Sequence, residues 1–283
     1  MFSPDQYSLL DFGAGRRLER FGSLVLDRPC PAVEGMPCAA PQRWADADAR
    51  FGDRGSGEEC WSQNGDLSDR WTIDHGPLRF ELKRTEFGHL GLFPEQAGNW
   101  DWIARQVKDH GPGMRVLNLF AYTGGCTLAA AAAGAEIVHV DAARNTVNWA
   151  RRNAELSGLA QAPIRWIADD AAKFVRREVK RGNRYDAVVL DPPSYGHGAR
   201  GEVWRLSKHL MPLLKNCARL TSGRRRFILL TCHTPGYGAE RLGEMLAQAC
   251  DDQSGHISAG PLAIRSVDGR DMPSGVFACW SAR

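Results

Sequence analysis

Four aspartates in the C-terminal two-thirds of the chain stand where short apolar runs end. They are Asp141, Asp169, Asp170 and Asp191. An ionised carboxylate accepts several hydrogen bonds at once, so such residues suit the hydroxyls of a ribose and the amino groups of a base. The structural alternative for each is a helix N-cap, a position that aspartate favours. The first chemistry to consider is therefore recognition of a nucleoside by carboxylates at strand ends.

The run Asp191-Pro192-Pro193-Ser194-Tyr195 is the most specific motif in the chain. Neither Pro192 nor Pro193 can extend a sheet, because proline has no N–H. The pair predicts a rigid shelf at the mouth of a site, where Asp191 exchanges a hydrogen bond with an amino group or ring nitrogen of a substrate. Pro193, Ser194 and Tyr195 are predicted to contact that substrate by hydrogen bonds or stacking. A purely structural turn is the alternative.

A glycine pair follows the apolar run from Met114 to Phe120. Gly124 and Gly125 let the backbone turn tightly and approach a ligand closely. The helix expected after them would present its free N–H groups to the same place. A Gly-rich turn without a ligand is the alternative. The turn lacks the GxGxxG pattern of dinucleotide-binding enzymes, which argues against a dehydrogenase.

Strands and helices are predicted to alternate from residue 94 onward. The predicted strands are Met114 to Phe120, Glu136 to Val140, Ile164 to Ala168, Tyr185 to Leu190, Arg226 to Thr231 and Gly275 to Trp280. The predicted helices are Glu95 to His110, Thr127 to Ala133, Ala143 to Ser157, Ala171 to Lys180, Lys208 to Leu220 and Glu240 to Ala249. Pro212 is expected to move the start of the fifth helix toward Met211. This alternation predicts an α/β fold with a mainly parallel, doubly wound sheet, whose ligands bind outside the carboxyl ends of its strands.

The first 93 residues differ from the rest in composition. They are rich in Gly, Pro, Asp and Trp, and their apolar runs are strand-length, as in Gly22 to Leu26 and Leu78 to Leu82. The stretch from Ala45 to Asp69 is polar and Gly-rich and is expected to be a loop. The prediction is a small β-rich module over residues 1–93, for substrate recognition, followed by a Rossmann-like catalytic domain over residues 94–283.

Composition limits the class of protein. With 283 residues, 43% hydrophobic and 24% charged, the chain can bury a large core, and a formal net charge of +3 permits a nucleic-acid substrate without arguing for one. The eight cysteines are scattered, with no CxxC pair or Cys/His cluster, so no metal site is expected. No signal peptide or bilayer-spanning run is visible. The expectation is a cytoplasmic protein with free cysteines, whose oligomeric state the sequence does not determine.

The run Leu117 to Gly125, taken with Asp141, the pair Asp169-Asp170 and the run Asp191 to Ser194, resembles the class I methyltransferases. Within them it resembles the bacterial family that includes the large-subunit ribosomal RNA cytosine-5 methyltransferases. The resemblance covers the chain from about Leu78 to Trp280. It implies S-adenosylmethionine as cofactor and RNA as substrate. By position it implies cofactor contacts from Phe93, Gln96, Asn118, Phe120, Tyr122, Thr123, Gly124, Gly125, Asp141, Ala142, Asp169, Asp170, Asp191 and Pro192.

The resemblance also implies which part of the cofactor each residue holds. Thr123 and Gly124 would lie at the methionine part, and Asp141 on the ribose. Asp169 or Asp170 would lie near the adenine, and the other is expected to cap a helix.

A cysteine, Cys232, directly follows the predicted strand from Arg226 to Thr231. The resemblance implies that Cys232 is a catalytic nucleophile that adds to carbon 6 of a cytosine, so that carbon 5 becomes reactive enough to accept a methyl group. Asp191 would lie beside that methyl group as the second catalytic residue and stabilise the ring at nitrogen 3. His233 is a candidate, by adjacency, for the base that removes the carbon-5 proton. The alternative for Cys232 is a structural cysteine at a strand end.

Two other functions stay open. One is methyl transfer to another acceptor, such as a guanine or adenine nitrogen, a protein or a small molecule. An amine acceptor needs no cysteine, and the run Asp191 to Tyr195 resembles the acidic, Pro-Pro-aromatic element of adenine-amino methyltransferases. The other is a non-catalytic module that binds nucleotide or RNA on the same scaffold, which the intact Asp141 and Asp191 argue against. The stretch from Gly196 to Gly201 is predicted to fold over the acceptor.

Overall fold

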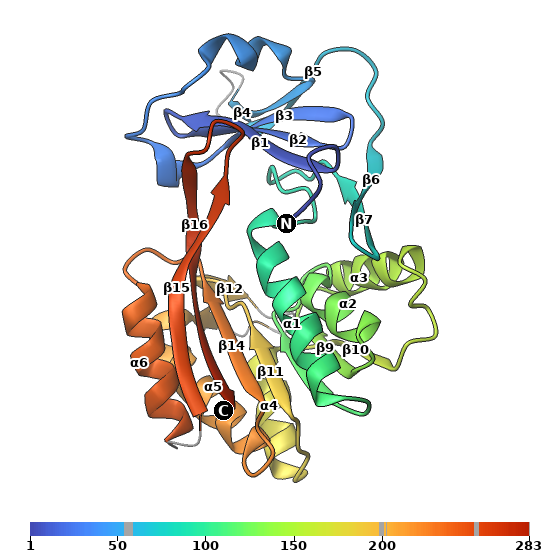
Figure 1. Ribbon diagram of the computed structural model, residues 1–283, viewed down its shortest axis with the longest axis vertical. Helices are drawn as coiled ribbons and strands as arrows, with labels where there is room; N and C mark the ends of the chain where they lie inside the picture. The colour runs from blue at the N-terminus through green and yellow to red at the C-terminus, as the bar shows by residue number, and fades with distance from the viewer. Residues whose placement is uncertain (54–58, 198–200, 202, 252–254, 283) are drawn as a thin grey trace. The chain divides into compact units, whose positions relative to one another are not determined.

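The computed structural model describes residues 1–283 apart from residues 54–58, 198–200, 202, 252–254 and 283 (Figure 1). The chain divides into two compact units. Unit 1 comprises Met1–Gly98 and Ala263–Ser274, and unit 2 comprises Asn99–Leu262 and Gly275–Arg283. The predicted domains, residues 1–93 and 94–283, stay a prediction.

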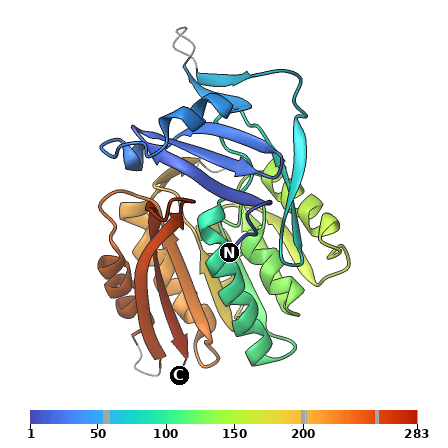
Figure 2. The same cartoon turned by 45° about the horizontal axis from the view of Figure 1, so that its top comes forward.

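Unit 1 contains a five-stranded sheet in the order β1-β2-β3-β4-β5 and a separate strand pair, β6 and β7. Neighbouring strands run antiparallel, except that β3 and β4 are parallel. Figure 2 shows the first strands of this sheet in blue. The β-rich character predicted for the N-terminal part is confirmed. The elements are β1 (Tyr7–Gly13), β2 (Arg16–Phe21), β3 (Leu24–Pro29), η1 (Pro31–Val33), η2 (Pro41–Asp46), β4 (Ala49–Asp53), β5 (Glu59–Gln63), β6 (Arg70–His75), β7 (Leu78–Lys83) and η3 (Pro94–Gln96).

The predicted loop from Ala45 to Asp69 is wrong in part, because β4 and β5 form within it. Phe51 of β4 is buried, and its ring centroid lies 5.3 Å from that of Trp61 on β5. Cross-strand aromatic pairs stabilise a sheet, so the buried Phe51 and the partly exposed Trp61 stabilise this strand pair although its sequence is mostly polar.

Asp11 joins three parts of unit 1 and is almost fully buried. Its carboxylate accepts the N–H groups of Ala39 and Ala40 and the indole N–H of Trp44, and it forms an ion pair with Arg270. These charge-assisted hydrogen bonds lower the pKa of Asp11, although burial by itself would raise it. The ion pair with Arg270 ties residues 263–274 to the N-terminal sheet.

Unit 2 contains a seven-stranded sheet in the order β10-β9-β8-β11-β14-β16-β15. The five strands from β10 to β14 in this order are parallel, and β16 runs antiparallel to β14. The predicted mainly parallel, doubly wound α/β sheet is confirmed. The strands are β8 (Arg115–Leu119), β9 (Glu136–Asp141), β10 (Ile164–Ala168), β11 (Ala187–Leu190), β12 (Tyr195–His197), β13 (Val203–Arg205), β14 (Phe227–Cys232), β15 (Gly255–Arg265) and β16 (Asp271–Ala282). The helices are α1 (Ala97–His110), α2 (Gly125–Ala132), α3 (Arg144–Leu156), α4 (Ala171–Lys180), α5 (Leu206–Thr221) and α6 (Ala239–Cys250).

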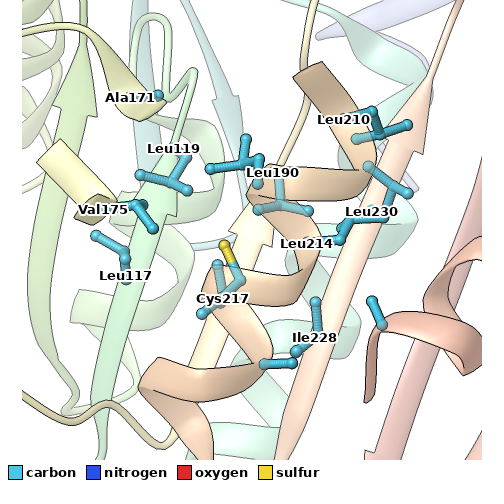
Figure 3. Close-up of a cluster of buried hydrophobic side chains, with 14 of the residues drawn as sticks. Leu117, Leu119, Ala171, Val175, Leu190, Leu210, Leu214, Cys217, Ile228 and Leu230 are labelled. Carbon is cyan, nitrogen blue, oxygen red and sulfur yellow. The ribbon is translucent and has the colours of Figure 1, made fainter. Parts of the chain in front are cut away.

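The core of unit 2 lies on both faces of this sheet, because side chains alternate along each strand. Leu117, Ile228 and Leu230 point to the face that α4, α5 and α6 cover, as Figure 3 shows. Val116 and Leu229 point to the opposite face, where α1 and α2 pack. Both faces are thus closed by helices, which leaves the ends of the strands as the place for a site.

The start of α5 and the strand β15 differ from the prediction. Helix α5 begins at Leu206 rather than near Met211, and Pro212 lies inside it, because burial of Leu206 and Leu210 extends the helix past the proline. Strand β15 was not predicted, since its side chains are mostly exposed and form no apolar run. At 16 residues α5 is the longest helix described, and no described helix is long and apolar enough to cross a membrane.

Candidate functional site

Asp141 is the last residue of β9, and its carboxylate holds the turn that follows β8. Oδ2 accepts the N–H of Tyr122 and Oδ1 accepts that of Ala143, each at 2.9 Å. The N-cap of α3 is Ala143, so the structure does not support the N-cap alternative for Asp141. Burial raises the pKa of Asp141, and each oxygen has a further lone pair with which to accept a hydroxyl. Ala142, which stands between Asp141 and Ala143 in the chain, is half-buried.

The turn after β8 has an unusual backbone. Phe120, Tyr122 and Gly124 have φ angles of 53°, 49° and 95°, all in the left-handed region. For the two aromatic residues this conformation costs about 1–2 kcal/mol each and is most often found at functional sites. The bond from the Tyr122 N–H to Asp141 and the bond from Asn153 Nδ2 to the carbonyl of Thr123, at 3.0 Å, hold the turn in place.

The two glycines of this turn are required by packing within unit 2. A Cβ on Gly125 would lie 2.5 Å from the ring of Trp100, and one on Gly124 would lie 3.2 Å from the Cβ of Ala150. Close approach of a ligand was the predicted reason for both glycines, with a turn without a ligand as the alternative, and this packing is a further reason for them. Gly124 is also the N-cap of α2, where it offers no side chain to the N–H groups of the first turn.

Asp169 and Asp170 follow β10 and have different interactions. Asp170 is the N-cap of α4, and its Oδ1 accepts the N–H of Lys173 at 2.7 Å. Asp169 pairs with Arg177, and its backbone N–H donates to the carbonyl of Asp141 at 2.9 Å. The structure therefore brings Asp169 next to Asp141 and uses Asp170 as a cap, which is one of the two arrangements expected from the sequence.

Asp191 follows β11 and lies beside His233, which follows β14. The distance from Asp191 Oδ1 to His233 Nε2 is 3.5 Å, and both side chains are about one-third exposed. The two loops are joined a second time by Ser194 Oγ and Thr234 Oγ1, which lie 2.7 Å apart. The carboxyl ends of these neighbouring parallel strands thus present a carboxylate, an imidazole and two hydroxyls.

The double proline is joined by hydrogen bonds to the segment that follows it, and its role as a substrate shelf stays a prediction. Pro192 is buried and Pro193 is exposed, and the carbonyl of Pro193 accepts the indole N–H of Trp204 at 2.7 Å. The N–H of Leu206 donates to the carbonyl of Ser194 at 3.0 Å. Tyr195, which begins β12, is 51% exposed.

Cys232 points away from the group formed by Asp191 and His233. It shares the sheet face of Ile228 and Leu230, is 1% exposed, and its Sγ accepts the N–H of Thr234 at 3.5 Å. This placement favours the structural alternative. The role of Cys232 as a nucleophile stays a prediction.

Some of the predicted residues belong to unit 1 or lie outside the described part of the chain. Phe93 and Gln96 belong to unit 1, where Phe93 is the N-cap of η3 and Gln96 is buried, so their contact with the cofactor stays a prediction. Residues 198–200 of the predicted lid from Gly196 to Gly201 lie outside the described residues. Among the side chains that the structure describes, no group of three His, Cys, Asp or Glu could hold a metal ion.

A buried polar chain beneath the turn was not foreseen. Asn118 Nδ2 donates to Thr127 Oγ1 at 2.9 Å, and Thr127 Oγ1 lies 2.9 Å from His139 Nδ1. Asn118 is buried, and its hydrogen bond joins β8 to α2, so the contact with the cofactor predicted for it stays a prediction. The signal in the sequence is a histidine within the apolar strand from Glu136 to Asp141, where a polar residue needs a partner.

His139 makes the stability of unit 2 depend on pH. Burial, with a smaller contribution from Arg151, lowers the pKa of His139 from 6.5 to about 3. A histidine whose pKa is lower in the folded state stabilises fully above the unfolded value, and this stability is lost as the pH falls below about 6.5. We expect the unfolding free energy of the wild type to fall between pH 7 and pH 5 by about 2 kcal/mol more than that of His139→Gln. Urea denaturation at both pH values measures this, and equal losses would contradict it.

Comparison with known proteins identifies the family. A model of the S-adenosylmethionine-dependent methyltransferases matches residues 40–249, which is more than half of the chain. The chain belongs to this family. A structure of the S-adenosylmethionine-dependent methyltransferase from Agrobacterium tumefaciens is 36% identical and superposes with a TM-score of 0.93, covering 98% of this chain and 91% of that one. A methyltransferase from Streptococcus mutans, 16% identical, shares the fold with a TM-score of 0.74, covering 98% of this chain and 75% of that one.

Curated relatives of this methyltransferase include proteins named for ribosomal RNA. Ribosomal RNA large subunit methyltransferase I of Aeromonas hydrophila is 38% identical over 110 residues, which is 38% of this chain and 27% of that protein. Ribosomal RNA large subunit methyltransferase K/L of Pseudoalteromonas atlantica is 28% identical over 210 residues, which is 71% of this chain and 27% of that protein. Both matches span about a quarter of the relative's length.

The residues of unit 2 fit S-adenosylmethionine, the cofactor of the family. Asp141 is held by two backbone N–H groups at a strand end, the position where such folds bind a ribose. The N-cap of α2 is Gly124, which has no side chain to accept the N–H groups of the first turn, so these groups can donate to a ligand at this positive helix end.

Proposed function

We propose that this methyltransferase modifies a base in RNA, and that the acceptor atom is a nitrogen of that base. A nitrogen acceptor is supported by the pair formed by Asp191 and His233, whose side chains lie 3.5 Å apart at the ends of neighbouring parallel strands. RNA as the substrate class is supported by the names of the curated relatives, which are large-subunit ribosomal RNA methyltransferases.

The cofactor supplies a methyl group made electrophilic by the positive sulfur that carries it. The residues of the site then have separate tasks. Asp191, next to the rigid prolines, accepts a hydrogen bond from the acceptor nitrogen and orients it. His233 Nε2 takes the proton that this nitrogen loses, and the neighbouring carboxylate stabilises the imidazolium that results. Ser194 supplies a hydroxyl at the same edge.

Cytosine carbon 5 is the second candidate acceptor, and it rests on Cys232. That reaction needs a thiolate that reaches carbon 6 of the base. Cys232 is 1% exposed and belongs to the same buried cluster as Ile228 and Leu230, which argues against such reach. The two candidate acceptors therefore predict different rates of methyl transfer for Cys232→Ala.

RNA from a strain of the source organism that lacks the gene is the test substrate. We expect the purified chain to transfer label from S-adenosylmethionine to this RNA, and mass analysis of its nucleosides to place the methyl group on a base nitrogen. Cys232→Ala is expected to keep the rate within about threefold, since burial gives this thiol no access to a base. Loss of transfer in Cys232→Ala together with 5-methylcytidine in the wild-type product would establish the carbon-5 reaction instead. Absence of any methylated RNA would overturn the proposal as a whole.

A further inference from the structure

We propose that the exposed face of the β12–β13 hairpin binds the RNA nucleotide next to the target base. This face, named here the hairpin face, consists of Tyr195, Val203 and Arg205. The inference rests on the proposed function and adds a binding surface to it.

The register of the hairpin determines which side chains share a face. Tyr195 pairs with Arg205, and Gly196 pairs with Trp204. Residues directly opposite each other in antiparallel strands lie on the same face, and neighbours along a strand alternate. Tyr195, Arg205 and Val203 therefore lie on one face, and Trp204 lies on the other.

Trp204 anchors the hairpin to the loops of the site. It is 6% exposed, its indole N–H donates to the carbonyl of Pro193 at 2.7 Å, and its ring centroid lies 5.0 Å from that of Phe120 in the turn after β8. The hairpin is thus attached both to the proline shelf and to the turn beside Asp141. Because it is held before RNA binds, little ordering is required on binding.

The hairpin face combines an exposed aromatic ring, an apolar side chain and a cation. Tyr195 is 51% exposed, Val203 is 42% exposed, and Arg205 is exposed, with Lys208 exposed on the first turn of α5. An aromatic ring stacks on any base, and a neighbouring arginine or lysine pairs with the phosphate, which is how proteins bind single-stranded nucleic acid. The positive charge beside the ring favours RNA over an apolar protein surface as the occupant.

The test measures RNA binding and methylation separately. Unmodified large-subunit ribosomal RNA transcribed in vitro is the probe, and filter binding gives its Kd. Tyr195→Ala is expected to raise the Kd roughly 5- to 150-fold, the range found for loss of one stacked base, whereas Tyr195→Phe keeps the ring and stays near wild type. Arg205→Ala is expected to reduce the slope of log K against log salt by about one, because one phosphate contact is lost.

Arg219→Ala is the matched control, because Arg219 is exposed near the other end of α5. Calorimetry with S-adenosylmethionine should give the same affinity for all variants, which shows that each is folded. If the wild type methylates RNA but Tyr195→Ala and Arg205→Ala bind the transcript as tightly as Arg219→Ala, the hairpin face serves another partner and the inference fails. If the wild type methylates no RNA, the proposed function fails first, so the two failures are distinguishable.

Discussion

Replacing Asp191 by alanine is expected to lower the rate of methyl transfer roughly 100- to 10,000-fold, the usual contribution of a residue that takes part in proton transfer. Asp191 orients the acceptor nitrogen and lies 3.5 Å from His233, so its removal affects both partners of the pair. Single-turnover transfer to RNA at saturating S-adenosylmethionine measures the effect on the chemical step.

Two further variants make this result specific. Asp191→Asn keeps the shape of the side chain but not its charge, and we expect it to lose most of the rate while it keeps its affinity for RNA. Asp109→Ala removes an exposed aspartate of α1 and should behave as the wild type. A rate for Asp191→Ala within tenfold of the wild type would show that the reaction does not depend on this carboxylate.

Asp141→Ala is expected to weaken the binding of S-adenosylmethionine roughly 10- to 150-fold, the equivalent of about 1.5–3 kcal/mol for a hydrogen bond to a charged group. The substitution removes the proposed bonds to the ribose, and it also releases the N–H groups of Tyr122 and Ala143, so the turn loses its support. Isothermal calorimetry measures the affinity without any need for the RNA substrate.

Asp170→Ala is the matched control for this second prediction. Because Asp170 caps α4, its loss should lower the unfolding free energy by about 1 kcal/mol and leave the cofactor affinity within about twofold. A loss of affinity equal to that of Asp141→Ala would mean that Asp170, rather than Asp169, contacts the cofactor.

The parallel sheet could be predicted because its strands are short apolar runs, and three of them, β9, β10 and β11, end in or are followed by an aspartate. Asp141, Asp169 and Asp191 were recognised from this position, and the topology alone then places them at one edge of the sheet. The same reasoning could not find β4, β5 and β15, whose strands bury few side chains and so leave a weak pattern.

The direction in which a side chain points was harder to predict than its place in the chain. Cys232 and His233 are neighbours in sequence, but strand alternation turns Cys232 into the core and leaves His233 beside Asp191. Gly125 looked like a ligand-binding glycine, yet only the structure shows the Trp100 ring against it. Such facts depend on which residues meet in space, and one sequence does not contain them.

The interleaving of the two units affects how the chain matures on the ribosome. Arg270, which pairs with Asp11, is synthesised after almost all of unit 2. Nascent chains usually complete their N-terminal domain first, but here the buried Asp11 has no Arg270 until the last residues emerge. A translation product that stops before residue 263 would therefore leave a carboxylate without its counter-charge in the first unit. In the second unit it would lack β16, the strand that joins β15 to β14 in the sheet. Premature termination late in the gene should thus yield a product in which both units are destabilised.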